Sequence, residues 1–503
     1  MVGDWAVALV LRRRNAALWA TAAVALGAVL YLVLLGPPPP PGFIRDEASV
    51  SYNAYAISQN LHGQNGGLLP LYFKSFGDYK SPLFIYVLAA VFRVTGPSKA
   101  VAIGTAGSVV ALAVLLLGLL AWRRTRSLFA ASATMALAAL TPWLYDLGRV
   151  VFDTTIEPLL IVLVVIAVDW SYRSERGTLA RALPPALALG GLTYSYAGGR
   201  LTAPVWAAAL IVFAGRGRWR WLLSTWSLYV VTMVPLGIYS LVHPGALSAR
   251  YQDVTIAKGG VSAGRVVLDF FSNYARDANP WHWVTSGDPR PYIHVYGSPQ
   301  LFATTAVLAL AGIVLIVRRA RHDRFWWFVG LALLLTPVAD AVTVERDYSL
   351  RLLALPILLT LLCVPALEAL GRSARQDWPA RFAIAGLALL LVPQVAQYRS
   401  NYAERNSGRA VLFESDVPGL LQQAFAAGTT VYIDHDDIYA QTHALWYVVT
   451  HGIATPRVSI LPDGGIPPLG SMVFGRLQTC DYTCPHIADA ETYWIARAAG
   501  PKQ

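Results

Sequence analysis

Two adjacent carboxylates, Asp46 and Glu47, lie in the segment "GFIRDEASVSYNAYAISQN", which covers residues 42–60. The segment follows a run of five prolines and an apolar stretch long enough to cross a bilayer. A carboxylate at the edge of a membrane can take the proton from an attacking hydroxyl group, which is general-base catalysis. The alternative interpretation is structural, because an acid in the first turn stabilises the start of a helix.

Charged residues that could serve a phosphate occur in later gaps between apolar runs. Lys80 lies in "GDYKSPLF", Arg149 and Asp153 lie in "LGRVVFDTT", and Arg351 lies in "ERDYSLR". Lys and Arg bind phosphate through charge-assisted hydrogen bonds, and Arg does so with a planar fork of donors. These residue types suit an enzyme that holds a lipid phosphate with cations while a carboxylate serves the reacting sugar or the acceptor.

Each of these residues also has a structural interpretation. Lys80 could anchor an interfacial helix, and Arg149 with Asp153 could form an ion pair beside a span. Tyr196 in "LTYSYAGGRL" could belong to a belt of interfacial aromatics. Trp281 and His282, in "WHW", favour loop packing or sugar stacking over metal binding, because a single His without a spaced partner is not a ligand set. "HDD" at 435–437 has metal-capable residue types, but a solvated strand end is the favoured interpretation.

The composition requires a membrane. The chain has 503 residues, of which 55% are hydrophobic and only 14% are charged, whereas a soluble protein has roughly a quarter charged residues. The net charge of +11 does not indicate nucleic-acid binding, because no basic stripe interleaved with aromatics is present. The basic residues instead cluster in short gaps, which is typical of cytoplasmic loops: 12–14, 123–126, 173–181, 216–220, 318–324 and 372–381.

The hydropathy pattern predicts an all-α polytopic membrane protein with about eleven spans. The predicted spans are 16–36, 100–121, 127–145, 155–171, 179–196, 200–214, 221–242, 299–317, 325–341, 350–370 and 380–397. The apolar run 83–92 is too short to span. If it lies along the membrane and the N-terminus is cytoplasmic, every basic cluster faces the cytoplasm. If it crossed, the clusters from 123 onward would lie outside, against the usual charge bias.

This topology places four substantial pieces outside: a first loop at 37–99, a short loop around 146–154, a long loop at 243–298 and a tail from 398. The tail carries a predicted strand in "GTTVYIDHDD" between two helical patterns, so we divide the chain into a membrane module at 1–397 and a small extracytoplasmic α/β domain at 398–503. Cys480 and Cys484 could pair if the tail faces an oxidising compartment. Span interiors hold almost no ionisable groups, which argues against a proton-coupled transporter.

The segments "RDEASVSYNAYAI", "SFGDYKSPLFIYV", "PWLYDLGRVVFDTTIEPLL", "FFSNYARDANPWHWVTSGDPR" and "ERDYSLRLLALP" resemble, in order and spacing, the GT-C superfamily of polyprenyl-phosphate-sugar glycosyltransferases. The resemblance is to bacterial family 39-like proteins, which are related to protein O-mannosyltransferases and the lipid A aminoarabinose transferase. Two departures are Ser81, where the family often has Pro, and Tyr348, where relatives often have His.

The resemblance implies roles for particular residues. Asp46 is the expected general base with Glu47 beside it, and Asp153 is the acid of the second loop. Lys80 and Arg351 match positions associated with the lipid phosphate, and Arg149 stands just before the second-loop acid. Possible substrate-binding residues are Tyr79, Tyr196, Trp281 and His282. The resemblance also implies interfacial helices in the first outer loop and requires no metal, although some relatives use one.

The sequence therefore predicts a multi-pass glycosyltransferase of the cell's inner (plasma) membrane. It would use a polyprenyl-phosphate-linked sugar as donor, with membrane lipids but no nucleic acid as partners, and would face away from the cytoplasm. The alternative is a non-catalytic flippase for lipid-linked sugars or a polysaccharide export component. The bare spans disfavour a flippase, which should line its path with polar groups. The sugar, the acceptor and the oligomeric state stay open.

Overall fold

A computed structural model describes residues 2–215, 217–426, 428–476 and 483–499. Its contacts form two compact units, each built from separate parts of the sequence. Unit 1 consists of Met1–Pro37, Ala106–Arg149 and Thr154–Tyr402, and unit 2 consists of Pro38–Thr105, Val150–Asp153 and Ala403–Gln503. The division of the chain at 397/398 remains a prediction, and the pairing of Cys480 with Cys484 involves a residue outside the described ones.

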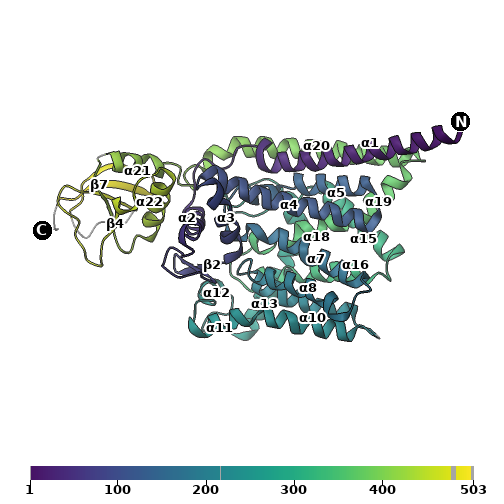
Figure 1. The fold of residues 1–503 in the computed structure, drawn as a ribbon, viewed down its shortest axis with the longest axis horizontal. Coiled ribbons are helices and arrows are strands. Elements are labelled where there is room, and N and C mark those ends of the chain that lie inside the picture. The colour runs from purple at the N-terminus through teal and green to yellow at the C-terminus, as the bar shows by residue number, and fades with distance from the viewer. Residues whose placement is uncertain (1, 216, 427, 477–482, 500–503) are drawn as a thin grey trace. The chain divides into compact units, whose positions relative to one another are not determined.

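Unit 1 is helical, and its long helices run side by side (Figure 1). All eleven predicted spans are helical. The helices are α1 (Val2–Leu30), η1 (Tyr31–Leu35), α4 (Lys99–Thr125, which begins in unit 2), α5 (Leu128–Leu140), α6 (Pro142–Leu147), η2 (Asp153–Ile156, whose first residue is in unit 2), α7 (Glu157–Arg173), α8 (Thr178–Thr193), α9 (Gly199–Ala209), η3 (Leu210–Phe213), α10 (Trp219–Thr232), α11 (Val234–Val242), α12 (Ala249–Val254), α13 (Ala263–Asp277), α14 (Pro280–Thr285), α15 (Ala303–Arg319), α16 (Arg324–Leu335), α17 (Val338–Ala341), η4 (Ser349–Arg351), α18 (Ala354–Leu362), α19 (Val364–Ser373) and α20 (Trp378–Asn406, which ends in unit 2).

The helices confirm a polytopic membrane protein. Among the described residues, seven helical segments are long and apolar enough to cross a bilayer. The other four predicted spans form shorter helices, namely α5, α8, α9 with η3, and α15. A helix needs about 20 residues to cross a hydrocarbon core about 30 Å thick. Shorter helices cross where the bilayer thins locally or where flanking side chains reach to the interface. The number of about eleven spans therefore remains a prediction.

The end of α1 lies against the start of α4. A side chain at Gly107 would come within 2.7 Å of the carbonyl oxygen of Leu32, so only glycine permits this approach. Thr21 of α1 bonds to Ser132 of α5, and farther along both segments Tyr31 of η1 contacts Tyr145 of α6. The helices α1 and α5 therefore run in the same direction. The chain therefore leaves α1 and enters α4 at the same end of the bundle. The intervening segment, including the run 83–92, makes no net crossing, as predicted, and its placement along the membrane stays a prediction.

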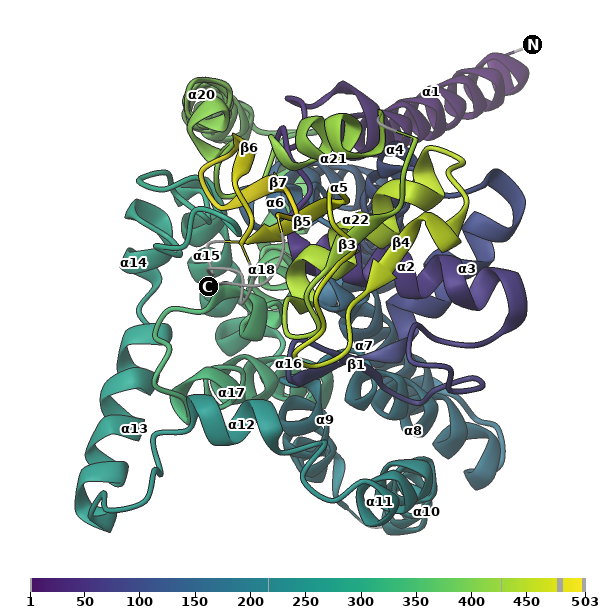
Figure 2. The ribbon, with the colours of Figure 1, turned by 90° about the vertical axis from the view of Figure 1, so that its left-hand side faces the viewer.

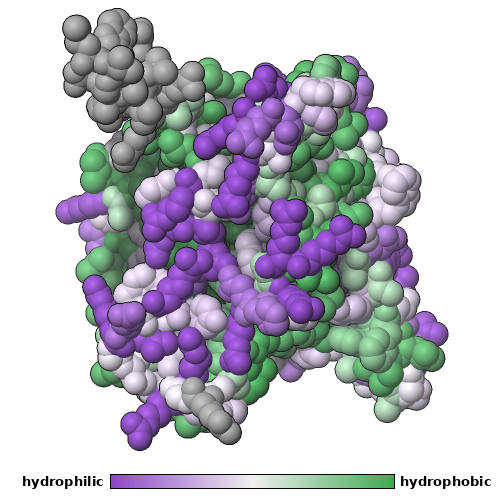
Figure 3. All heavy atoms as spheres, turned by 90° about the vertical axis from the view of Figure 1, so that its right-hand side faces the viewer, coloured by the Kyte–Doolittle hydropathy of each residue, from purple (hydrophilic) through white to green (hydrophobic). Residues whose placement is uncertain are grey.

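The opposite end of the bundle gathers the basic clusters. The guanidinium of Arg124 bonds to Asp169 at 2.7 Å and also to Asp323, and Arg173 bonds to Asp169 at 3.0 Å. Arg181 donates to the carbonyl of Ser171. Hydrophilic side chains cover this end of the molecule in Figure 3. Clusters that are far apart in sequence thus share one end, as the charge bias of cytoplasmic loops predicts.

Unit 2 joins the first outer loop to the C-terminal residues. The loop contributes α2 (Arg45–Asn60), the hairpin of β1 (Phe73–Ser75) and β2 (Asp78–Lys80), and α3 (Pro82–Thr95). Proline at the first position and glycine after the last residue define α3. The prediction of helices in this loop is confirmed, and α2 and α3 pack against each other.

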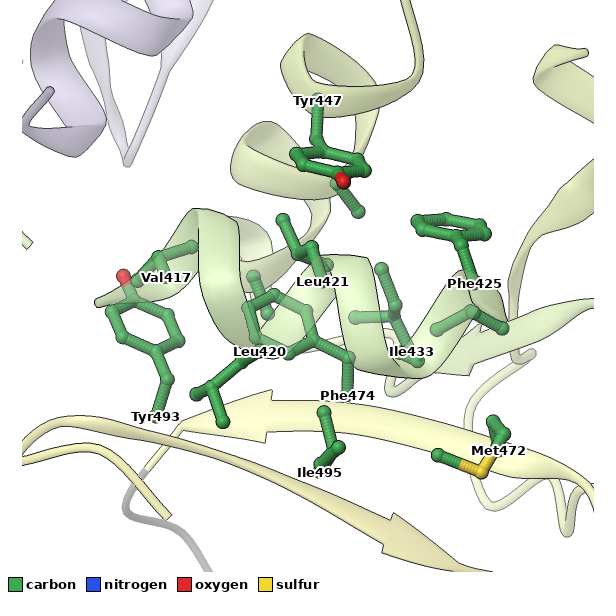
Figure 4. Packing of buried hydrophobic residues seen from close by; sticks show 14 of the residues in the cluster. Val417, Leu420, Leu421, Phe425, Ile433, Tyr447, Met472, Phe474, Tyr493 and Ile495 are labelled. Atoms are coloured by element: carbon green, nitrogen blue, oxygen red, sulfur yellow. The ribbon is translucent and has the colours of Figure 1, made fainter. Parts of the chain in front are cut away.

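The C-terminal residues of unit 2 form the predicted small α/β domain. Its sheet has the strand order β4-β3-β5-β7-β6, with β3 parallel to β4 and β5 and with β7 antiparallel to β5 and β6 (Figure 2). Residues of α21 and α22 pack on this sheet around Leu421, Phe425, Phe474 and Ile495 (Figure 4). The elements are η5 (Ser407–Arg409), α21 (Val417–Ala426), β3 (Val431–Ile433), α22 (Ile438–Thr450), η6 (Thr455–Arg457), β4 (Val458–Ile460), β5 (Met472–Arg476), β6 (His486–Asp489) and β7 (Tyr493–Arg497).

Candidate functional site

An ion pair between Asp46 and Lys80 is the centre of the candidate site in unit 2. Asp46 lies in the first turn of α2, and Lys80 is the last residue of β2. The ammonium group of Lys80 donates a hydrogen bond to Oδ1 of Asp46. The side chain of Lys80 is 16% exposed and that of Asp46 is 32% exposed. The pair is therefore partly shielded from water yet open to a ligand.

The hairpin brings Lys80 to this position. Its tight turn uses a positive φ at both Phe76 and Gly77, and the register pairs Phe73 with Lys80. Burial alone would lower the pKa of the Lys80 ammonium, but the carboxylates of Asp46 and Asp153 outweigh that effect and raise the pKa above its ordinary value. Lys80 therefore remains a cation at physiological pH.

Asp153 holds the backbone next to Lys80. Its Oδ2 accepts a hydrogen bond of 2.8 Å from the backbone N–H of Ser81, and the residue is buried. The structure thus brings three of the predicted residues, Asp46, Lys80 and Asp153, into one neighbourhood. Asp153 fixes the position of the lysine segment through this bond, a contact that sequence alone does not show.

Glu47 faces away from solvent. Its side chain is 1% exposed, and its oxygens accept backbone hydrogen bonds of 2.9 Å from Ile44 and Val151. The first bond caps α2, and the second ties the helix to the segment that carries Asp153. Burial, opposed by these two hydrogen bonds, raises the pKa of Glu47 from its ordinary 4.5 to about 7.

The raised pKa of Glu47 predicts a pH-dependent stability. Between pH 4.5 and 7 the folded chain keeps a proton on Glu47 that the unfolded chain releases, so the contribution of Glu47 to stability is complete below pH 4.5 and is lost as pH rises through about 7. Thermal unfolding of the purified protein in detergent should show this. The melting temperature of wild type, relative to Glu47→Gln, should fall by a few degrees from pH 4.5 to pH 8. A pH-independent difference would contradict a buried, titrating Glu47.

Arg351 is the centre of a second charged cluster, in unit 1. One nitrogen of its guanidinium donates to Asp340 at 3.0 Å and to Thr343 at 2.9 Å, and the other nitrogen donates to Glu345. Glu345 also accepts a 3.0 Å bond from Arg250. A single carboxylate that is 28% exposed therefore bridges two arginines.

Aromatic residues surround this second cluster. The guanidinium of Arg351 lies 4.5 Å from the ring centre of Tyr348, and the guanidinium of Arg290 lies 4.6 Å from the same ring centre. Tyr196 interacts electrostatically with Arg351. The structure therefore places two of the predicted residues, Arg351 and Tyr196, in the same cluster of unit 1.

Arg149 has structural partners in unit 1. Its guanidinium donates to the carbonyl oxygens of Tyr31 at 3.1 Å and Val33 at 3.5 Å, and it lies over the ring of Tyr145. Both carbonyls belong to η1, the π-helical end of the first helix, and the last carbonyls of a helix lack partners within it. These contacts account for Arg149 without a ligand, and its predicted role in phosphate binding stays a prediction.

The remaining predicted substrate-binding residues lie in separate places. Trp281 is 71% exposed on α14, and His282 lies 3.5 Å from a carboxylate oxygen of Asp347. Tyr79 lies in β2 opposite Lys74. Asp437, in the segment "HDD", caps α22. The predicted roles of Tyr79, Trp281 and His282 in substrate binding are untested.

Sequence reasoning missed three residues that organise these clusters: Asp340, Arg250 and, in unit 2, Glu414. None of them lies in a recognised motif, and Arg250 and Glu414 have partners far away in the sequence. Across residues 2–499, apart from the undescribed positions, no group of three or more His, Cys, Asp or Glu side chains is arranged to hold a metal ion. The need for a metal is therefore still open.

Comparisons with known proteins find likeness in structure. The chain is similar to ArnT from Cupriavidus metallidurans bound to undecaprenyl phosphate, with a TM-score of 0.59 and 13% identity over 96% of this chain and 98% of that one. The apo state of that ArnT gives a TM-score of 0.55 and 14% identity, covering 97% and 100% of the two chains. Archaeal oligosaccharyltransferase AglB from Archaeoglobus fulgidus, in complex with an inhibitory peptide and a dolichol-phosphate, gives 0.52 and 11% identity over 87% of this chain and 64% of that chain.

No family model and no curated protein matches the sequence. The likeness to the solved structures extends over nearly the whole chain and shows that this chain shares their fold. At this level of identity the likeness concerns the fold, and function must be argued from the site.

Proposed function

We propose that this protein is a glycosyltransferase that transfers a hexose or pentose from a polyprenyl-phosphate carrier to an extracytoplasmic acceptor. The observation that supports it most is the Asp46–Lys80 pair, which places a carboxylate base beside a permanent cation on one partly open surface. Two of the solved structures similar to this chain hold undecaprenyl phosphate or dolichol-phosphate, which favours a carrier of that chemistry.

The proposed reaction is a displacement at the anomeric carbon of the sugar. An acceptor hydroxyl group attacks this carbon and gives its proton to Asp46, while the bond to the phosphate oxygen breaks and the phosphate leaves with the electron pair. Lys80 stabilises the negative charge on the departing phosphate. Asp153 keeps the lysine segment in place, and no metal is assigned a step.

The ion pair also explains how the base becomes available. While Lys80 bonds to Asp46, its ammonium group occupies Oδ1 of the carboxylate. An arriving phosphate competes for the ammonium and draws it away from Asp46. Binding of the donor thereby frees the carboxylate for the acceptor proton.

We place the active site on the outer side of the cell's inner membrane, with the N-terminus in the cytoplasm. The supporting argument is the gathering of basic clusters at one end of the helical bundle, away from the junction of α1 with α4. The first outer loop links α1 to α4, so it leaves and re-enters the bundle at that junction. This orientation therefore puts Asp46 and Lys80 outside.

Asp46→Asn should abolish transfer without weakening the binding of the carrier phosphate, because the amide cannot take the acceptor proton. We expect transfer of labelled sugar from a panel of polyprenyl-phosphate sugars in isolated membranes to fall by about 10²- to 10⁴-fold. Asp253→Asn, which changes an exposed carboxylate on α12, is the matched control and should retain activity. Persistent transfer by Asp46→Asn would show that another group is the base.

Lys80→Ala should weaken binding of undecaprenyl phosphate by roughly 10- to 100-fold, since a hydrogen bond from a charged group contributes about 1.5–3 kcal/mol. Lys80→Arg should retain most of the affinity because it keeps a cationic donor. Lys74→Ala removes an exposed lysine from the other strand of the same hairpin and should bind normally. Binding to the purified protein is the measurement, and equal affinity of Lys80→Ala and wild type would exclude Lys80 from the phosphate site.

Glu345→Gln should strengthen binding of the same carrier phosphate. Glu345 neutralises Arg351 and Arg250, and a phosphate that uses Arg351 must compete with this carboxylate. We expect a several-fold lower dissociation constant for undecaprenyl phosphate than in wild type or in the exposed-site control Glu491→Gln. Weaker binding would mean that Glu345 positions Arg351 instead of competing with the ligand.

A further inference from the structure

Glu414, in the C-terminal part of unit 2, is a buried carboxylate with four hydrogen bonds. It accepts the backbone N–H of Arg45 at 2.8 Å and the guanidinium of Arg45 at 3.2 Å. It also accepts His443 Nε2 at 2.7 Å and the hydroxyl of Tyr493 at 3.2 Å. The donors come from α2, α22 and β7, so one carboxylate joins the first outer loop to two elements of the C-terminal domain.

These contacts are energetically important because Glu414 is only 6% exposed. A buried carboxylate without donors costs several kcal/mol, so the folded chain must keep these partners in place. Burial would raise the pKa of Glu414, but His443 and Arg45 outweigh that effect and lower the pKa below its ordinary value. Glu414 also adopts a positive φ of 53°, a backbone conformation that non-glycine residues keep only when their surroundings enforce it.

The position of Asp46 depends on its two neighbours. The start of α2 leaves backbone N–H groups without helical partners, and buried carboxylates take two of them: Glu47 accepts from Ile44, and Glu414 accepts from Arg45. Asp46 lies between Arg45 and Glu47 in the sequence. Its backbone is therefore fixed from both sides, while its carboxylate meets Lys80.

Aromatic contacts reinforce the same junction. Trp446 of α22 stacks on Phe43, just before α2, with ring centres 5.5 Å apart, and on Phe92 of α3 at 6.0 Å. Tyr439 of α22 stacks on Phe76, at the tip of the hairpin that carries Lys80, at 4.8 Å. The helix α22 therefore contacts the segments on which both members of the ion pair depend.

We propose that the C-terminal domain positions the catalytic carboxylate, with Glu414 as the positioning residue that fixes Arg45 and thereby Asp46. This inference rests on the proposed function for its catalytic consequence. It assigns the domain a role different from acceptor recognition. Loss of the Glu414 contact should reduce the rate of the chemical step for every acceptor, whereas loss of an acceptor-binding surface should raise KM and change acceptor choice.

Hydrogen–deuterium exchange tests the contact without any turnover. In the purified full-length protein, Glu414→Gln should increase exchange of backbone amides in residues 44–50 at least several-fold, because the neutral side chain holds Arg45 less firmly. Glu491→Gln, the exposed-site control, should leave it unchanged. Unchanged exchange in Glu414→Gln would overturn the inference. If Glu414→Gln does not fold, Tyr493→Phe removes one donor to Glu414 and should show a smaller increase in the same residues; no increase would likewise overturn it.

Steady-state kinetics test the consequence. We expect Glu414→Gln to lower kcat by at least about tenfold, since small displacements of a catalytic group are costly, with KM for donor and acceptor near wild type. Unchanged kcat, or a raised acceptor KM at normal kcat, would contradict positioning. If wild type transfers no sugar from any donor tested, the proposed function fails, and the exchange result still decides whether Glu414 holds the start of α2.

Discussion

The ion pair between Asp46 and Lys80 is the interaction on which the structure of the first outer loop is centred. Two charges that are partly removed from water lose hydration, and their attraction compensates only when the geometry is fixed. Several contacts supply that geometry. Asp153 holds the backbone after Lys80, Glu47 caps the helix that carries Asp46, and Glu414 holds the residue before it. Contacts from three separate parts of unit 2 thus keep these two side chains together.

The bilayer imposes the second constraint. Charged residues are costly in hydrocarbon, so the helical bundle concentrates them at its ends. At one end, Arg124 joins Asp169 and Asp323 in a network of structural ion pairs. Near the residues 340–351, Arg351 bonds to Asp340 and Glu345. The first cluster lacks a partly exposed carboxylate that bridges two arginines. The second cluster has such a carboxylate in Glu345, which a phosphate can displace from the arginines.

The sequence predicts much of this architecture for physical reasons that operate locally. Length and hydropathy identify the helices, and the distribution of Arg and Lys correctly predicts that 83–92 makes no net crossing. The resemblance of the motif order to that of a known superfamily predicts that Asp46 and Lys80 belong to one site. The position of Glu414 could not be predicted, because its importance arises from partners such as Arg45, which is separated from it by 369 residues. Arg149 shows the reverse case, since its position in the sequence resembles a ligand-binding arginine while its contacts serve the carbonyls of η1.

The account depends on the first outer loop and the loop before Arg351 facing the same aqueous compartment. Single cysteines at Leu68 and Val344, both exposed, and at Glu175, between α7 and α8, would test this in a chain whose native cysteines are replaced by serine. A membrane-impermeant maleimide should label positions 68 and 344 in intact cells with a sealed inner membrane that the reagent reaches from outside. It should label position 175 only after permeabilisation. Labelling of 68 and 344 from opposite sides of the membrane would contradict the account.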